Sequence, residues 1–241
     1  MRKAHRHEGT QARRDAEVFT SCLPASCLRA SLAAWLLLLA AAGAQGRTIF
    51  LDFHDFDQIG GIAEAAPRQS LAFGEGPTAA FSNGQVALTP QVRFLVRYAL
   101  DKVPAGNQIV YAELIVPATN IGGTEPRFYL WRMLADWGPG VCYAYRSARP
   151  EKVNWAKPGA GGIGSDRAAA PTDIPRIVQA GQVTINVTED VEMWYSGAAK
   201  NNGWIFTVED PGTIVILASP LWNPIPGSWR LRITYEPKSE K

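Results

Sequence analysis

An all-β fold, an antiparallel sandwich or barrel, is predicted by three features of this sequence. Short runs of β-branched and aromatic residues with a period of two recur along the chain. Clusters of Gly, Pro and Asn separate these runs. Helix-like patterns are rare, so strands do not alternate with helices, and a parallel α/β sheet is therefore not expected.

Strands are expected, in chain order, at 48–53, 93–100, 108–116, 127–134, 203–208, 213–218 and 228–235. Turn signals stand at 104–107 (PAGN), 120–123 (NIGG) and 223–227 (NPIPG). No linker composition interrupts the series, so residues 45–241 are expected to form a single domain.

The first 44 residues are interpreted as a removable export signal. A basic lead precedes the apolar run SLAAWLLLLAAAGA, and Ala42 and Ala44 fit a small-residue cleavage site. The run is shorter than the roughly 20 residues that a bilayer requires, and no membrane span is expected in the mature chain. The expected location is outside the cytoplasm: secreted, periplasmic or in the cell envelope.

Charge argues against a nucleic-acid partner. Residues 45–241 contain 18 Lys and Arg against 19 Asp and Glu, so the basic excess of the full chain belongs to the lead. Cys142 is the one cysteine of this part, which rules out an intramolecular disulfide there, and burial as a small hydrophobe is expected for it.

A short helix is expected near 188–196. Thr188 is the predicted cap, and Val191, Trp194 and Tyr195 share one helical face. In the following strand, Trp204 belongs to the apolar alternating set. Both tryptophans are therefore predicted to be core residues rather than a sugar platform.

Several stretches, taken together, resemble the DNRLRE-domain family of secreted bacterial β-sandwich modules, which is related to a carbohydrate-binding family. They are, in family order, FLVRYALDKVPAG, VYAELIV, FYLWRMLADWGPG, KVNW, VTINVTEDVEMWYSGAAKNNGWIF and SWRLRITY. Pro139 and Asn186 stand where the family has acidic residues, whereas the apolar positions are kept. The resemblance implies a jelly-roll sandwich and a non-catalytic, glycan-related role.

No catalytic residue is assigned. His54 is the one histidine of the mature chain, and no nucleophile motif accompanies it. Arg127 and Tyr129 on one strand face give the best case for a polysaccharide lyase, and paired carboxylates leave a glycoside hydrolase open. No cofactor is expected; Asp52, Asp55 and Asp57 are the candidates for calcium, although their spacing is not that of an EF-hand.

Ligand binding is expected on the loop side, in or beside the irregular segment Cys142–Ala180. The candidate binding residues are Tyr143, Tyr145, Arg146, Arg149 and Trp222. Trp137 and Trp155 could also stack on a sugar, but they are expected instead to pack against each other under the loop. The predicted partner is an extracellular polysaccharide; the alternative is a structural or adhesive role in which another component of the cell envelope is bound.

Overall fold

A computed structural model describes residues 46–70, 85–123, 126–220 and 229–238 of this chain. The predicted export signal, the turn at 223–227 and the candidate Trp222 lie outside the described residues.

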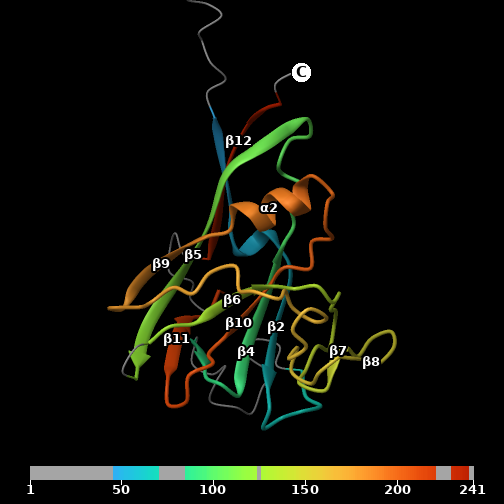
Figure 1. The fold of residues 1–241 in the computed structure, drawn as a ribbon, viewed down its shortest axis with the longest axis vertical. Coiled ribbons are helices and arrows are strands. Elements are labelled where there is room, and N and C mark those ends of the chain that lie inside the picture. Colours follow the sequence, from blue (N-terminus) through green and yellow to red (C-terminus); the bar gives the residue numbers. More distant parts are fainter. Residues whose placement is uncertain (1–45, 71–84, 124–125, 221–228, 239–241) are drawn as a thin grey trace, which may run out of the picture. The chain divides into compact units, whose positions relative to one another are not determined.

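The larger sheet is built around one long strand, β5 (Asn107–Gly122). Its strand order is β1-β12-β5-β11-β3, and β9 also pairs with β5, all antiparallel (Figure 1). The bounds of its other strands are β1 (Arg47–Leu51), β3 (Gln85–Leu88), β9 (Gly181–Asn186), β11 (Ile214–Ala218) and β12 (Arg230–Pro237).

The turn predicted at 120–123 is wrong, because β5 continues through Pro117 to Gly122. Strand β12 pairs with β5 only as far as Ile115, and β9 and β11 then supply the neighbouring backbone up to Gly122. Pro117 therefore lies beyond the β12 ladder. Partner strands override the local turn signal here.

The smaller sheet has the order β2-β4-β10-β6 and is also antiparallel. Its strands are β2 (Phe56–Ala63), β4 (Val92–Tyr98), β6 (Tyr129–Arg132) and β10 (Trp204–Thr207). A 3-10 turn, η1 (Phe53–Asp55), links β1 to β2. The short hairpin β7 (Tyr145–Ser147) with β8 (Val153–Asn154) stands apart from both sheets.

The main core is formed by inward residues of both sheets. Its largest fully buried side chains include Trp204, Trp229, Tyr98, Phe94 and Phe206. Their rings meet edge-on or tilted, for example Phe94 and Trp229 at 5.2 Å between centroids. The predicted all-β antiparallel sandwich is thus confirmed, while the jelly-roll connectivity stays a prediction.

A second core covers the outer face of the smaller sheet. Ile62, Leu95, Trp131 and Ile205 point away from the main core and pack against residues 134–167, here called the cover segment. From this segment come Trp137, Val141, Trp155 and Ala160, all buried. The sheet is therefore buried on both faces, and the expected burial of Trp137 and Trp155 under the loop is confirmed.

Buried polar contacts hold the cover segment in place. The two carboxylate oxygens of Asp166 accept the backbone N–H groups of Ala156, Lys157 and Gly162 at 2.8–2.9 Å. The indole N–H of Trp155 donates to the carbonyl of Cys142 at 2.8 Å. Cys142 is buried, as predicted. The segment is irregular in secondary structure but its backbone groups have fixed partners.

The helix α2 (Thr188–Tyr195) confirms the predicted short helix, and Val191 and Trp194 face the core. The predicted cap is wrong: Val187 holds the cap position and no side chain caps the helix. The Thr188 hydroxyl instead accepts from the Ala112 N–H at 2.9 Å, because β5 lies beside the helix (Figure 1). Trp194 lies 4.6 Å from Trp204 between ring centroids, so both are scaffold.

Candidate functional site

A cleft of about 380 Å³ lies between the smaller sheet and the cover segment. We call it the arginine cleft. It is lined by residues of β2, β4, the bend after β6 and the β7–β8 hairpin: Gln58, Arg97, Asp136, Trp137, Gly138, Pro139, Arg146, Ser147, Arg149 and Val153. Three of these side chains are basic and one is acidic.

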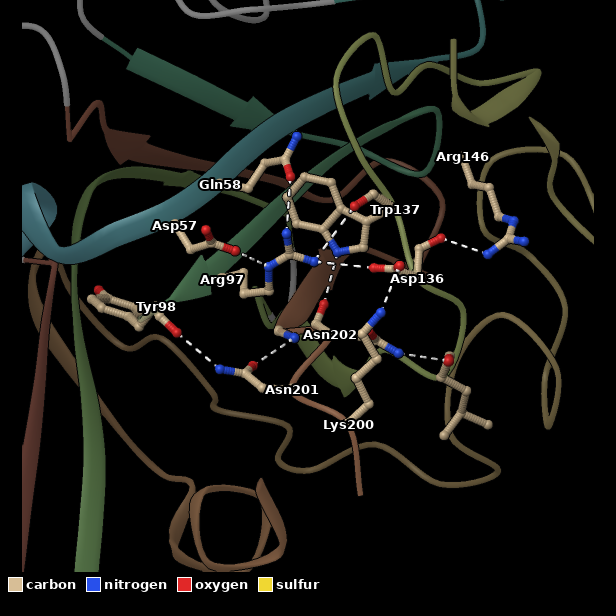
Figure 2. A network of polar contacts seen from close by, with 12 residues as sticks. Asp57, Gln58, Arg97, Tyr98, Asp136, Trp137, Arg146, Lys200, Asn201 and Asn202 are labelled. Atoms are coloured by element: carbon tan, nitrogen blue, oxygen red, sulfur yellow. Dashed lines mark hydrogen bonds and ion pairs between the residues drawn. The ribbon is translucent and has the colours of Figure 1, made fainter. Parts of the chain in front are cut away.

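Arg97 forms the floor of the cleft and is held from several sides (Figure 2). Its guanidinium donates to Asp57 at 2.5 Å, to Gln58 at 3.0 Å and to Asp136 at 3.3 Å. It also lies 5.4 Å from the centroid of the Trp137 ring. Only 14% of its side chain is exposed, so Arg97 contributes a fixed positive charge.

The bend after β6 is anchored from the opposite side. The Trp137 indole donates to the carbonyl of Asn202 at 2.7 Å, and the Asn202 amide donates to the carbonyl of Leu134 at 2.7 Å. Lys200 pairs with Asp136 at 2.7 Å (Figure 2). The last contact joins the loop before β10 to the rim of the cleft.

The electrostatics of Asp136 follow from these neighbours. Partial burial by itself would raise the pKa of this carboxyl, but the hydrogen bond and charge of Lys200, together with Arg97, outweigh it and hold the pKa below its ordinary value. Asp136 therefore stays ionised at neutral pH and is already occupied by two cations.

Arg146 and Arg149 form the open side of the cleft. Arg146 donates to the backbone carbonyl of Asp136 at 2.7 Å, and Arg149 is exposed. Within the described ranges, neither guanidinium is paired with a carboxylate. These two side chains are therefore available to an anionic ligand, which a guanidinium can bind through two parallel hydrogen bonds.

The structure brings together only some of the predicted binding residues. Arg146 and Arg149 line the cleft, whereas Tyr143 and Tyr145 do not. Tyr143 is half-buried and packs against the second core. The ammonium group of Lys152 lies over the ring of Tyr145, 5.6 Å from the ring centroid. Trp222 lies outside the described residues.

Arg97, Asp136 and Lys200 were not predicted. A sequence signal did exist for Arg97, because the period of two in RFLVRYAL places Arg93, Leu95 and Arg97 opposite the buried Phe94, Val96 and Tyr98. No local pattern indicates that Asp136 and Lys200 meet, since 64 positions separate them.

The calcium candidates each have another partner. Asp52 accepts the His54 N–H at 2.9 Å as the cap of η1, Asp55 pairs with Lys102, and Asp57 pairs with Arg97. Across the described ranges, no group of three or more His, Cys, Asp or Glu side chains is arranged to hold a metal ion. His54 is exposed and contacts Asp52.

Arg127 and Tyr129, the lyase candidates, lie on one face as predicted. Arg127 forms a two-pronged contact with Asp210 at 2.9 and 3.2 Å and stands 5.9 Å from the Tyr129 ring centroid. Arg127 stands just before β6, an edge strand of the smaller sheet, and the contact with Asp210 gives this arginine a structural role.

Comparison with protein-family models and with curated proteins finds no match for this chain. The resemblance to the DNRLRE-domain family therefore rests on the sequence stretches quoted above. Among the described residues, none of the helices is long and apolar enough to cross a membrane.

Proposed function

We propose that this chain is an exported, non-catalytic module of the DNRLRE type that binds acidic extracellular carbohydrate in the arginine cleft. The observation that carries the proposal is the pair Arg146 and Arg149, which face a cleft whose third arginine is already held by carboxylates. Carboxylate or sulfate groups of a glycan are the anions that such a guanidinium pair suits.

The construction of the cleft supports a binding role. Its volume of about 380 Å³ falls within the range of small-ligand sites, about 300–1,000 Å³. Arg97 and Asp136 are fixed by contacts with three different parts of the chain, so little order has to be created on binding. The apolar part of the lining is small: Pro139, Val153 and Trp137, of which Trp137 is almost fully buried. Charge and hydrogen bonds, rather than stacking, are expected to supply the affinity.

The test compares two double variants with the same loss of charge. Arg146→Ala with Arg149→Ala removes the open side of the cleft. Arg47→Ala with Lys238→Ala removes two exposed cations on the larger sheet and its end, away from the cleft lining. The probes are an oligogalacturonide and a neutral galacto-oligosaccharide of equal length, titrated by calorimetry at low and high salt.

We expect the parent protein to bind the oligogalacturonide, and its affinity to fall as salt rises. The cleft variant should lose at least about tenfold in affinity, whereas the control variant should stay within about twofold of the parent. Equal losses in the two variants would mean that net charge and not the cleft attracts the ligand. If no acidic glycan binds at all, the alternative of a structural or adhesive envelope protein replaces this proposal.

A further inference from the structure

A larger pocket, of about 700 Å³, lies beside the start of helix α2 and shares no residue with the arginine cleft. We call it the α2 pocket. It is lined by the end of β6, by the segment after the cover segment and by the start of α2: Arg132, Ala168, Ala169, Ala170, Pro171, Thr172, Asp173, Asn186, Val187, Thr188, Glu189, Asp190 and Glu192.

The floor of the α2 pocket is an ion pair between Arg132 and the buried carboxylate of Asp190. Asp190 is 6% exposed; one carboxylate oxygen pairs with Nε of Arg132 at 2.9 Å. The other accepts from the Thr172 hydroxyl at 2.6 Å and from the Trp204 indole at 2.7 Å. The carboxylate is thus held by β6, β10 and the 168–173 segment at once, and it cannot turn without breaking these contacts.

This arrangement leaves donors for a ligand. Arg132 is held through Nε, and its two terminal nitrogens contact no acceptor within the described ranges. Asn186 uses its carbonyl oxygen to accept from the backbone and the hydroxyl of Thr188, at 3.0 and 2.7 Å, so its amide nitrogen is left as a donor.

Acceptors stand on the rim of the same pocket. Glu189 and Glu192 are exposed, and Asp173 is half-buried with one oxygen on the backbone N–H of Ile174. The small side chains Ala168, Ala169 and Ala170 keep the space between floor and rim open. None of the lining residues is aromatic, so recognition in this pocket depends on hydrogen bonds.

The mixture of groups selects the class of ligand. Four carboxyl groups against one guanidinium repel an acidic glycan, and a simple cation has no use for the donor groups of Arg132 and Asn186. A neutral sugar is complementary to the acceptors and to the donors of the pocket, because each hydroxyl can donate to a carboxylate and accept from a guanidinium or amide. The volume lies within the range of small-ligand sites.

We propose that the α2 pocket is a second carbohydrate site, which takes neutral sugar units. The proposal rests on the proposed function, since it assumes that extracellular glycan is the partner of this chain. It adds that one glycan with both acidic and neutral units would be held at two places of opposite charge.

The experiment uses isotope-labelled protein and two kinds of probe. Neutral hexasaccharides of glucose, xylose and mannose are titrated first, and an oligogalacturonide is titrated on the same sample, while backbone amide shifts are followed. We expect one neutral oligomer to shift the amides of 168–173 and 186–190 with a dissociation constant on the order of 1 mM, unchanged between low and high salt.

Ala169→Trp is the blocking variant, because Ala169 is exposed, lines the pocket and makes no contact with the floor ion pair. Ala198→Trp, also exposed but outside the lining, is its matched control. Blocking should weaken neutral binding by about tenfold or more, and the control should leave it unchanged.

The outcomes separate the two proposals. If the oligogalacturonide shifts the arginine cleft and no neutral oligomer shifts the α2 pocket, the second site is overturned and the proposed function stands. If neutral oligomers bind the parent and Ala169→Trp equally well, the second site is overturned as well. If neither probe binds anywhere, both proposals fail.

Discussion

The two faces of the smaller sheet are both buried, but they are covered in different ways. The inner face packs against the larger sheet, so regular strands bury Phe94, Trp204 and Phe206. The outer face packs against the irregular cover segment, where single tryptophans fill the space and donate their indole N–H to backbone carbonyls. The inner face makes the sandwich, and the outer face makes the arginine cleft.

This difference teaches that stability and binding can be perturbed separately in this protein. Losing the inner packing should unfold the whole sandwich. Losing the outer packing should release the cover segment and its cleft while both sheets persist, because regions with their own set of contacts open as local units.

The largest effect is expected for Trp204→Ala, on the inner face. Trp204 has no exposed surface, and its indole N–H is a partner of the buried Asp190. Removing it should lower the free energy of unfolding by about 3–5 kcal/mol, through the cavity and the lost hydrogen bond. Urea unfolding followed by fluorescence and by far-UV circular dichroism should show one common, shifted transition. A change below about 1 kcal/mol would show that the inner face is not the main core.

A smaller effect of a different kind is expected for Trp155→Ala, on the outer face. Trp155 is 4% exposed, and its indole N–H donates a hydrogen bond to the carbonyl of Cys142. We expect a loss of about 3 kcal/mol, the lower end of the range for large aromatic residues, because the irregular segment can partly close over the gap. Hydrogen exchange should accelerate within 134–167 and stay slow in β4 and β10. If hydrogen exchange accelerated equally in both sheets, the outer packing could not be lost separately from the inner packing.

The next test adds atoms to the outer face rather than removing them. Gly60 of β2 is buried against the cover segment, and a Cβ placed there would collide with Val141. Gly60→Ala should lower stability by about 1–3 kcal/mol, as for other overpacked sites. Gly122→Ala, on β5 with open space around its Cβ, is the control and should be close to neutral. A neutral Gly60→Ala would mean that the cover segment moves aside freely.

The inner face could be predicted from sequence for a physical reason. Alternation in strands such as Trp204–Thr207 directly records which side chains are buried, and the same holds for the helical face of Val191 and Trp194. Strand β2 was missed because its two adjacent glycines give no alternation, and β3 because it has only four residues. Strand β9 was also missed, although GQVTIN does alternate.

The outer face could be predicted only in part. Composition indicated an irregular segment at Cys142–Ala180, which overlaps the cover segment, and Trp137 and Trp155 were expected to be buried, but the turns of the segment could not be predicted. Those turns depend on contacts such as Asp166 with three backbone N–H groups, and no periodicity records them. Arg146 and Arg149 could be named as candidates because basic residues in a long irregular segment stand out, whereas Lys200 reaches the cleft only through folding.

The smallest expected effect concerns pH and the rim of the cleft. Lys200 and Arg97 hold the pKa of Asp136 below its ordinary value of 3.8. A lowered folded-state pKa means that the ionised carboxylate stabilises the folded protein. This contribution is fully present above pH 3.8 and is lost as the pH falls through the lower, folded-state value. Asp136→Asn should remove it at neutral pH. Because half of the Asp136 side chain is exposed, solvent screens the contacts and the loss should be at most about 1 kcal/mol.

Thermal unfolding of the two proteins from pH 7 downward should show the parent more stable at neutral pH and the difference closing below pH 3.8. High salt should also reduce the difference. A gap that stays constant from pH 7 to pH 2 would mean that Asp136 stabilises the folded protein through its packing and not through its charge.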